Sequence, residues 1–488
     1  MHRFTQRGLL KSDSARLVLI GCALEAVYLL YLLRSFPLIN HYEKPLLDLG
    51  KIAGFSQGAG YSFLLAFTAL YLLYYAAYRI ALRHGPANLG IVVFFSLVFA
   101  ATLVMVYPIG AADVFDYIAE ARVLSVYHAN PFVQVPAGFP ADPFVVYAAW
   151  PLAPAAYGPL WTGLSAGVTL LAGNGLLTNI FAFKLLAVIF YLACIWVIHG
   201  ILARTAARQV LAGTLFFAWN PLVVFEVSAN AHNDIVMVFF LLLAIVLLQQ
   251  DRKKLSVAAL AFSYLIKYIT ILLLPLFLAS AAKRIHGLKS RLAFLVLSML
   301  ISALLSGALY LPFWSGTDPL SLSRRQEMFT VSLPTVALTI LGPLVGEHEA
   351  QLVISRLALV LLGAFVAYQT WRTSREPWSV TRISFEVLFF FLAFACLWFQ
   401  PWYLMWLVAL AALLTRVDIA HRTMLFCYSA TMIYFMFVFY WVWNAPSLNG
   451  IAIQQHAAVV VYFLPIAYTG YTLINARLAN RKMVSRET

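Results

Sequence analysis

The stretch LGIVVFFSLVFAATLVMVY, residues 89 to 107, contains no charged residue. The hydrocarbon core of a bilayer takes ~20 helical residues, so this run is long enough to cross a membrane. Many separate stretches of this kind follow one another in a chain of 488 residues that is 63% hydrophobic and 11% charged. We therefore predict an all-α polytopic integral membrane protein with about twelve spanning helices and additional short helices.

The chain is basic, with 33 Lys and Arg residues against 19 Asp and Glu residues. The basic residues stand in short clusters between apolar runs, a pattern that orients membrane helices, so we expect no nucleic-acid partner. The cluster from Arg3 to Arg16 and the tail from Arg477 predict that both termini are cytoplasmic. The same alternation predicts that loops 109–157 and 313–349 are extracytoplasmic.

The cysteines indicate neither a disulfide framework nor a zinc site. Each lies inside an apolar segment, with no spacing typical of metal ligands: Cys22, Cys194, Cys396 and Cys427. The first apolar stretch, Leu17 to Phe36, contains Glu25 and is followed by no small-residue cleavage site, so we expect it to be a retained span.

Two apolar segments, 160–172 and 255–281, lie between loops whose charges allow no net crossing. We expect each to contain a short, broken or re-entrant helix, which is stable at membrane depth only where protein or a water-filled cavity satisfies its backbone. Lys267 lies at the centre of the second segment.

Acidic residues follow the run at 89–107 directly, in the stretch GAADVFDYIAEA, residues 110 to 121. If a helix begins after Ala112, then Asp113, Asp116, Tyr117 and Glu120 share one face. Several acids on one face repel one another, so some must meet a cation, a metal or a proton. The alternative is that Asp113 caps an interfacial helix and the other acids form its solvated face. Both interpretations stay open from the residues alone.

Other polar and aromatic segments are expected on the same external face. They are YAAWPLAPAAYGPLW (147–161), EVSANAHND (226–234), SGTDPLSLSRRQEMF (315–329), WFQPWYLMW (398–406) and WVWNAPSLNG (441–450). Because they stand at the mouths of several helices, they predict a concave site between those helices.

The motifs ADVFDY, NPF and YGPLW together resemble the first external loop of the GT-C superfamily of membrane glycosyltransferases. Three later segments resemble, in the same order, parts of bacterial polyprenol-phosphate-mannose-dependent mannosyltransferases, including glycosyltransferase family 87. These segments are WNPLVVFEVSANAHNDIVMVFFLLLAI (219–245), YLIKYITILLLPLF (264–277) and FQPWYLMWLVAL (399–410).

The resemblance covers roughly Leu89 to Leu414 and implies three parts. Residues 1–88 form a two-span extension, 89–414 a GT-C-like catalytic module with interfacial helices in loop 109–157, and 415–488 C-terminal helices with a basic cytoplasmic tail. It also implies an active site on the extracytoplasmic face of a bacterial plasma (inner) membrane.

The activity that the resemblance implies is inverting transfer of one sugar, mannose by preference, from a polyprenyl-phosphate donor. The acceptor is a hydroxyl of a glycolipid, glycan or protein. A carboxylate of the first external loop is the expected base, because it can take the hydroxyl proton and stabilise an oxocarbenium-like carbon. Asp113 matches that acid, and Asp116 is the second choice.

The donor phosphate calls for cations near the outer membrane surface. We expect Arg324 and Arg325 to bind its oxygens, together with Lys267. A lysine inside an apolar run is costly without a partner, which favours a function, although it could also snorkel to the interface. For the two arginines, ordinary solvation of a loop is the alternative.

The remaining expected substrate-binding residues are polar or aromatic: Tyr117, Glu120, His232, Asn233, Asp234, Gln400, Trp402 and Tyr403. Helix capping is the alternative for 232–234, and an interfacial aromatic belt for 402–403. We expect no required cofactor. A divalent metal is possible, but His232 and Asp234 have no second histidine at ligand spacing.

Two other functional classes fit a polytopic helical protein. A secondary transporter or a glycolipid flippase would place broken helices at corresponding positions of two repeats, and no internal repeat is visible. A non-catalytic scaffold would leave the clustered acids unexplained. An enzyme is therefore the first choice.

Overall fold

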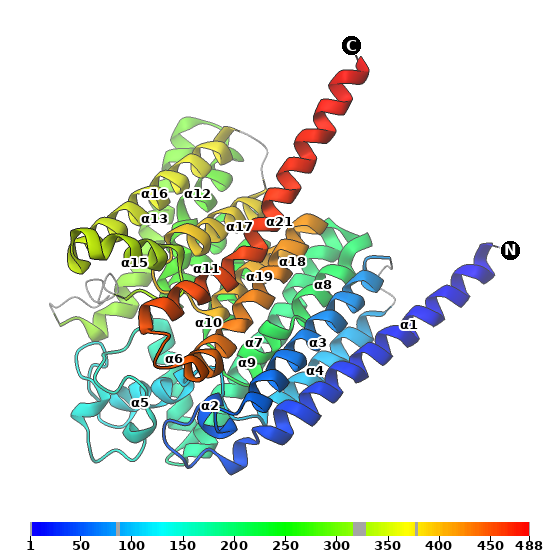
Figure 1. The fold of residues 1–488 in the computed structure, drawn as a ribbon. Helices are drawn as coiled ribbons and strands as arrows, with labels where there is room; N and C mark the ends of the chain where they lie inside the picture. The colour runs from blue at the N-terminus through cyan, green and yellow to red at the C-terminus, as the bar shows by residue number, and fades with distance from the viewer. Residues whose placement is uncertain (1, 84–87, 316–327, 376–378, 488) are drawn as a thin grey trace.

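The computed structural model describes residues 2–83, 88–315, 328–375 and 379–487. Within these ranges the regular structure is helical, and the only β-pairing consists of the isolated bridges Pro37–Val106 and Thr330–Trp398. Figure 1 shows the helices lying side by side, with the ends of α1 and α21 projecting beyond the bundle. The all-α polytopic prediction is confirmed.

The helices of the first half are α1 (His2–Val27), α2 (Leu49–Ala53), α3 (Gln57–Ala81), α4 (Leu89–Val104), α5 (Asp113–Ser125), α6 (Pro159–Ala172), α7 (Leu176–Thr205), α8 (Val210–Ala218), α9 (Pro221–Ser228) and α10 (Asp234–Gln249). Those of the second half are α11 (Lys253–Ile266), α12 (Leu274–Lys283), α13 (Leu288–Tyr310), α15 (Leu333–Val345), α16 (Glu347–Arg375), α17 (Val380–Phe390), α18 (Leu404–Leu414), α19 (Val417–Phe435), α20 (Trp441–Asn444) and α21 (Gly450–Glu487). Two 3₁₀ turns directly precede helices of the second half: η7 (Tyr268–Leu273) precedes α12, and η10 (Pro401–Tyr403) precedes α18.

Seven helices of the described chain are long and apolar enough to cross a membrane. The pair 207–218 and 221–228 adds one more span if its 49° bend lies within a single crossing. Six further apolar helices are shorter, so the expected number of about twelve spans depends on how many of them cross.

The bend between α8 and α9 follows from the local sequence WNP. Pro221 removes a backbone donor and stands at the first position of α9, where no intrahelical partner is needed. The Asn220 side chain accepts hydrogen bonds from the Leu222 and Val223 amides at 3.1 and 3.3 Å. A capped helix start therefore replaces a continuous helix at this point.

The predicted break in segment 255–281 is confirmed. Helix α11 ends at Ile266, Lys267 is extended with φ −146° and ψ 119°, and η7 leads into α12. Segment 160–172 lies in the single short helix α6. Whether either segment crosses the membrane or re-enters stays a prediction, as does the division into three parts.

A buried lysine stabilises the C-terminal end of α4. Lys184 of α7 is fully buried, and its ammonium donates to the carbonyl oxygens of Val104, at 3.1 Å, and Val106. These are orphan carbonyls at a helix end, which a cation satisfies well. The chain beyond α4 is thereby held where it leads into α5.

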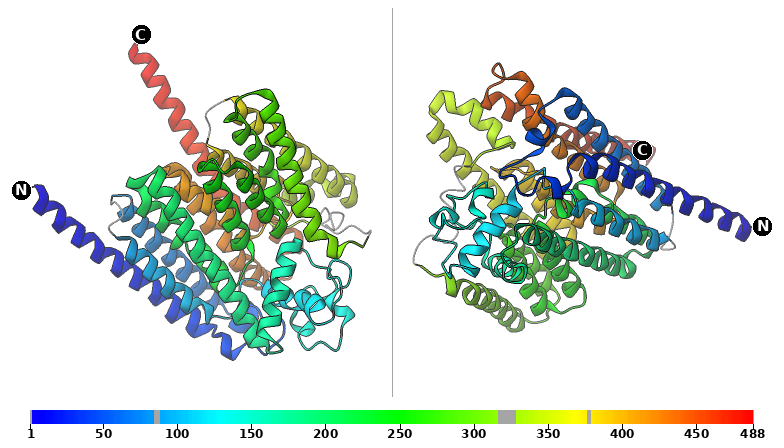
Figure 2. Two further views of the ribbon diagram at one scale, coloured as in Figure 1. Left: turned by 180° about the vertical axis from the view of Figure 1, so that it is seen from behind. Right: turned by 90° about the horizontal axis from the view of Figure 1, so that it is seen from below.

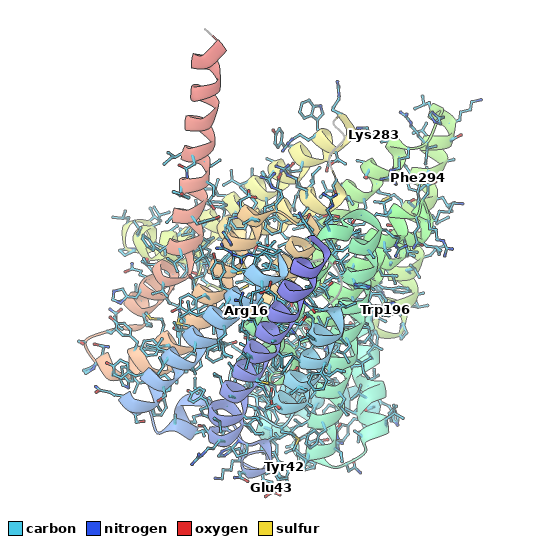
Figure 3. All side chains as sticks on the ribbon, turned by 90° about the vertical axis from the view of Figure 1, so that its right-hand side faces the viewer. Arg16, Tyr42, Glu43, Trp196, Lys283 and Phe294 are labelled. Carbon is cyan, nitrogen blue, oxygen red and sulfur yellow. The ribbon has the colours of Figure 1, made fainter. Side chains whose placement is uncertain are left out.

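The loops that surround α5 meet at one end of the molecule, called here the α5 end. The Tyr147 hydroxyl donates to the Glu43 carbonyl at 3.1 Å, joining loop 109–157 to the loop after α1. Figure 3 shows Tyr42 and Glu43 at the end opposite Lys283. The right-hand view in Figure 2, seen from below, looks onto the α5 end, where the cyan segment around α5 covers one part of the surface.

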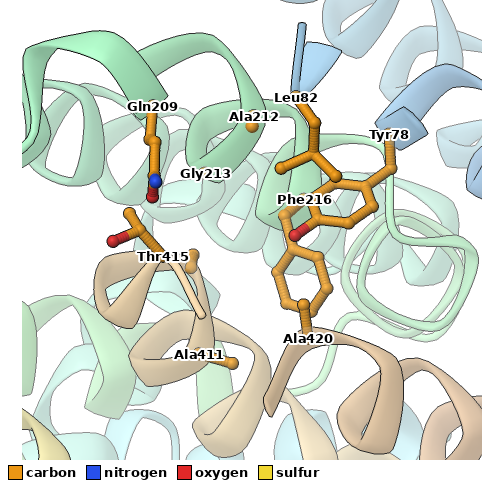
Figure 4. Close-up of a pocket in the computed structure, with 10 residues that line it drawn as sticks. Tyr78, Leu82, Gln209, Ala212, Gly213, Phe216, Ala411, Thr415 and Ala420 are labelled. Carbon is orange, nitrogen blue, oxygen red and sulfur yellow. The ribbon is translucent and has the colours of Figure 1, made fainter. Parts of the chain in front are cut away.

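A small pocket lies among α3, α8, α18 and α19 (Figure 4). Its volume of about 10 Å³ holds roughly one water molecule, which is too little for a sugar. It is lined by Tyr78, Leu82, Gln209, Ala212, Gly213, Phe216, Ala411, Ala412, Thr415 and Ala420.

Candidate functional site

Asp113 is the first residue of α5, and its carboxylate is surrounded by polar side chains. The N-cap is Ala112, so Asp113 does not cap the helix through its side chain. Its Oδ2 accepts a hydrogen bond from the Tyr157 hydroxyl at 3.0 Å and a longer one from the Tyr117 hydroxyl at 3.5 Å. His232 Nδ1 lies 3.7 Å from the same oxygen. The side chain of Asp113 is 20% exposed, so it remains accessible to a ligand.

The YGP motif is positioned by close backbone contact with the break in segment 255–281. The Gly158 amide donates to the Ile266 carbonyl at 2.9 Å, and the Tyr268 hydroxyl donates to the Tyr157 carbonyl at 3.1 Å. A Cβ at position 158 would lie 2.0 Å from the Leu265 carbonyl oxygen. Only glycine allows this approach, which brings the Tyr157 side chain to Asp113.

Lys267, at the break, forms an ion pair with a buried acid. Its ammonium donates to both carboxylate oxygens of Asp234 at 2.9 Å, and the Trp406 indole donates to Oδ1 at 2.6 Å. The Asp234 side chain is fully buried, whereas that of Lys267 is 13% exposed. The snorkelling interpretation of Lys267 is wrong, because the charge is directed into the protein.

Aromatic rings surround the Lys267 ammonium. The ring centres of Tyr403, Tyr157 and Trp406 lie 4.4, 5.5 and 5.6 Å from Nζ. Such faces stabilise a cation where water is scarce. Tyr157 thus contacts both Lys267, through its ring, and Asp113, through its hydroxyl. Burial raises the pKa of the Tyr157 phenol, so it stays a hydrogen-bond donor.

A second buried acid, Glu226, is separated from Asp113 by the His232 ring. Glu226 of α9 accepts hydrogen bonds from the Tyr434 hydroxyl at 2.6 Å and from the Asn230 amide at 2.7 Å. His232 Nε2 lies 3.3 Å from Glu226 Oε2. The imidazole is fully buried and stacks on the Trp402 ring, with 4.0 Å between ring centres and 17° between planes.

Asn233 completes the group of buried polar residues. It is fully buried at the N-cap of α10, and neither side-chain amide atom has a hydrogen-bond partner in the described part of the chain. Buried amides are ordinarily paired, so this position suits a ligand hydroxyl or an ordered water. Its expected role in substrate binding stays a prediction.

Asp116 lies on the same helix as Asp113 but has a different partner. Its Oδ1 accepts a hydrogen bond from the Trp150 amide at 2.8 Å, which ties α5 to the loop before Tyr157. Burial raises the pKa of Asp116 to about 7; the charge of Asp113 adds to the rise, and backbone donors at Trp150 and Ala149 oppose it. This geometry favours a structural role in the loop.

The remaining expected site residues are Glu120, Gln400, Arg324 and Arg325. Glu120 is half-buried further along α5, and Gln400 is half-buried just before η10. Arg324 and Arg325 lie outside the described residues. The roles expected for these four residues stay predictions.

Three residues in the site are not predicted from the sequence: Tyr157, Asn230 and Trp406. Each lies in a motif that was recognised, and what was missing was the partner across the fold. Arg122, which follows the acids, is buried against Asp142 at 2.7 Å and so supports the loop.

The arrangement indicates no metal centre in the part of the chain that the structure describes. Within it, no group of three or more His, Cys, Asp or Glu side chains is placed to hold a metal ion. His232 and Asp234 have different partners: His232 faces two carboxylates, and Asp234 binds Lys267. What the site does offer is an accessible carboxylate, on Asp113, and the ammonium of a partly exposed lysine, Lys267, which share Tyr157 as a neighbour.

Comparison with known proteins matches this architecture to one family. A family model described as alpha-(1->6)-mannopyranosyltransferase, N-terminal domain, matches residues 37–283, about half of the chain. The match includes α5, the YGP motif, Glu226, His232, Asp234 and Lys267.

Individual relatives are more distant. An alpha-(1->6)-mannopyranosyltransferase of Mycobacterium tuberculosis is 26% identical over 144 residues, which cover 29% of this chain and 24% of the relative. Alpha-(1->6)-mannopyranosyltransferase B of Corynebacterium glutamicum is 22% identical over 152 residues, covering 30% and 24%. The matched part thus spans about a quarter of the length of these relatives.

Proposed function

The chain belongs to the family described as the N-terminal domain of alpha-(1->6)-mannopyranosyltransferase, and from this membership we propose that it transfers a single mannose from a polyprenyl-phosphate donor to an acceptor hydroxyl. We propose inversion at the anomeric carbon, on the extracytoplasmic face of a bacterial plasma membrane. The acceptor is a glycolipid, a glycan or a protein.

One observation carries the proposal: Tyr157 contacts an accessible carboxylate through its hydroxyl and the ammonium of a partly exposed lysine through its ring. Transfer from a phosphosugar needs a base for the incoming hydroxyl and a cation for the outgoing phosphate, separated by the sugar. Asp113 supplies the first and Lys267 the second. The order of the motifs along the chain supports the same assignment.

In the proposed step, Asp113 takes the proton of the acceptor hydroxyl as its oxygen forms a bond to the anomeric carbon. The bond from that carbon to the phosphate oxygen breaks, and its electron pair leaves with the phosphate. Lys267 stabilises the charge of the leaving group. Asp234 holds the ammonium in place, so its third N–H is pre-positioned for a phosphate oxygen.

The activity is tested with purified protein in lipid vesicles. Polyprenyl phosphate carrying radiolabelled mannose is added with acceptors of the three classes, one at a time. We expect a labelled product of increased mass whose label survives mild acid, which cleaves the glycosyl phosphate of the donor but not a glycosidic bond. Movement of label across the vesicle membrane with no new glycosidic product would instead support a transporter or flippase.

The membrane face is tested by labelling in intact cells. Ser447 and Ser374 are both exposed. Ser447 lies in segment 441–450, expected outside, and Ser374 lies in the last turn of α16 beside Arg372 and Arg375, a basic cluster expected in the cytoplasm. We expect an impermeant maleimide to label Ser447→Cys in intact cells and Ser374→Cys only after lysis. Labelling of both in intact cells would contradict the proposed orientation.

A further inference from the structure

His232 lies between two carboxylates that come from different helices. Nδ1 faces Asp113 of α5 at 3.7 Å, and Nε2 faces Glu226 of α9 at 3.3 Å. Both contacts have the distance of an ion pair and lack the alignment of a hydrogen bond. Contacts at catalytic sites are often long in the unliganded protein and shorten when the substrate binds.

The partners of Glu226 decide where the proton between it and His232 resides. Both Glu226 oxygens already accept hydrogen bonds, from Tyr434 at Oε1 and from Asn230 at Oε2. A carboxylate that accepts from both sides is favoured in its ionised form. The proton in the contact therefore belongs to His232 Nε2, which leaves the lone pair of a neutral imidazole at Nδ1, facing Asp113.

We infer that His232 is a positioning residue that acts through Asp113. It holds the proton that Asp113 takes from the acceptor hydroxyl, and this inference rests on the proposed function. After transfer, the O–H bond of Asp113 breaks and an N–H bond forms at Nδ1. The resulting imidazolium lies between two carboxylates, and Asp113 is again an anion. The fully buried imidazolium then returns the proton through Asp113, whose side chain is 20% exposed, to solvent before the next cycle.

The surroundings of His232 suit this role. Asp113 faces it from α5, Glu226 from α9 and the uncharged Trp402 ring from η10. Beyond these, Tyr434 of α19 contacts Glu226, and Asp116 acts on Asp113. The nearby cation Lys267 is bound to Asp234. The charged groups that face the ring are thus both anions, which stabilise an imidazolium.

Three variants separate the proton-holding role from packing. His232→Phe keeps a planar ring on Trp402 but has no nitrogen. Glu226→Gln keeps the size and the Tyr434 contact but removes the charge that stabilises the imidazolium. His421→Gln is the matched control, because His421 is a half-buried histidine whose hydrogen-bond partner is Tyr468, outside the site.

We expect His232→Phe and Glu226→Gln each to lower kcat by at least about 10-fold, with the KM for the lipid-linked donor within about 2-fold. A loss in kcat with little change in KM separates a role in the proton step from a role in donor binding. His421→Gln should match the wild type. Thermal unfolding of each variant shows whether it is folded.

Wild-type kcat in His232→Phe would overturn the inference, because packing alone would then explain the ring. If that variant does not fold, Glu226→Gln decides the question by the same measurements. Failure of the proposed function looks different: the wild-type protein itself would form no mannosylated product.

Discussion

The Tyr157 hydroxyl donates a hydrogen bond to Asp113 at 3.0 Å, although 44 residues separate the two in sequence. The tyrosine ring also lies against the Lys267 ammonium. A single side chain therefore links the carboxylate of the first loop to the cation at the helix break. The first three predictions concern this connection.

Asp113→Asn should lower turnover by about 10²-fold or more, because asparagine retains the shape but cannot take a proton. Donor binding and folding should persist. The rate of mannose transfer is measured at saturating donor, with exposed Glu43→Gln at the same end as the control. If Asp116→Asn is inactive while Asp113→Asn is active, the roles of the two acids are exchanged. Activity in both would contradict a catalytic role for this helix.

Tyr157→Phe should lower kcat by about 10-fold, the effect of losing a hydrogen bond to a charged group. The ring that covers Lys267 is retained, so the KM for the donor should change little. Tyr147→Phe is the matched control, since its hydroxyl binds the Glu43 backbone at the same end of the molecule. An equal loss in both variants would indicate general loosening of the loop.

Lys267→Met should weaken use of the lipid-linked donor, and it should also destabilise the protein. Removing a lone lysine at membrane depth would cost little stability. Lys267, however, neutralises the buried Asp234, and breaking such a pair costs about 3–5 kcal/mol of folding stability. The double variant Lys267→Met, Asp234→Asn should recover the melting temperature but not the donor affinity. Recovery of both would exclude Lys267 from phosphate binding.

Gly158→Ala should destabilise the protein and abolish transfer, because the added Cβ would meet the Leu265 carbonyl at 2.0 Å. Gly163→Ala in α6 is the control: its Cβ would meet nothing within 4 Å, and alanine favours a helix by about 1 kcal/mol. Melting temperatures of the two variants should therefore move in opposite directions. A tolerated alanine at 158 would show that the loop can shift away from α11.

The raised pKa of Asp116 predicts a pH dependence of stability. Between about pH 4 and pH 7 the folded protein holds a proton on this carboxyl that the unfolded chain has released, so stability should fall as pH rises through this window. Asp116→Asn keeps the acceptor for the Trp150 amide and should flatten the dependence. Unfolding followed at pH 4.5, 5.5, 6.5 and 7.5 checks this, and identical curves for the two proteins would contradict it.

Local signals in the sequence were sufficient for the helical membrane class, for the helix that starts at Asp113 and for the break at Lys267. These signals are the length of an apolar run, a proline, and a charge inside an apolar run. Each affects the conformation of the residues next to it in sequence. The break at Lys267 lies in a segment predicted to be broken, whereas the bend at WNP was not predicted. The acids were recognised because an α-helix places residues three and four apart on one face, whatever it packs against.

Only the tertiary structure decided which polar groups meet. Asp113 and Asp116 share a helix, yet one faces Tyr157 and the other the Trp150 amide. Lys267 finds its counter-charge on Asp234 because α10 and α11 pack together, and Trp406 reaches the same carboxylate from α18. A buried charge is stable only beside a partner, and the packing of distant helices determines which partner that is.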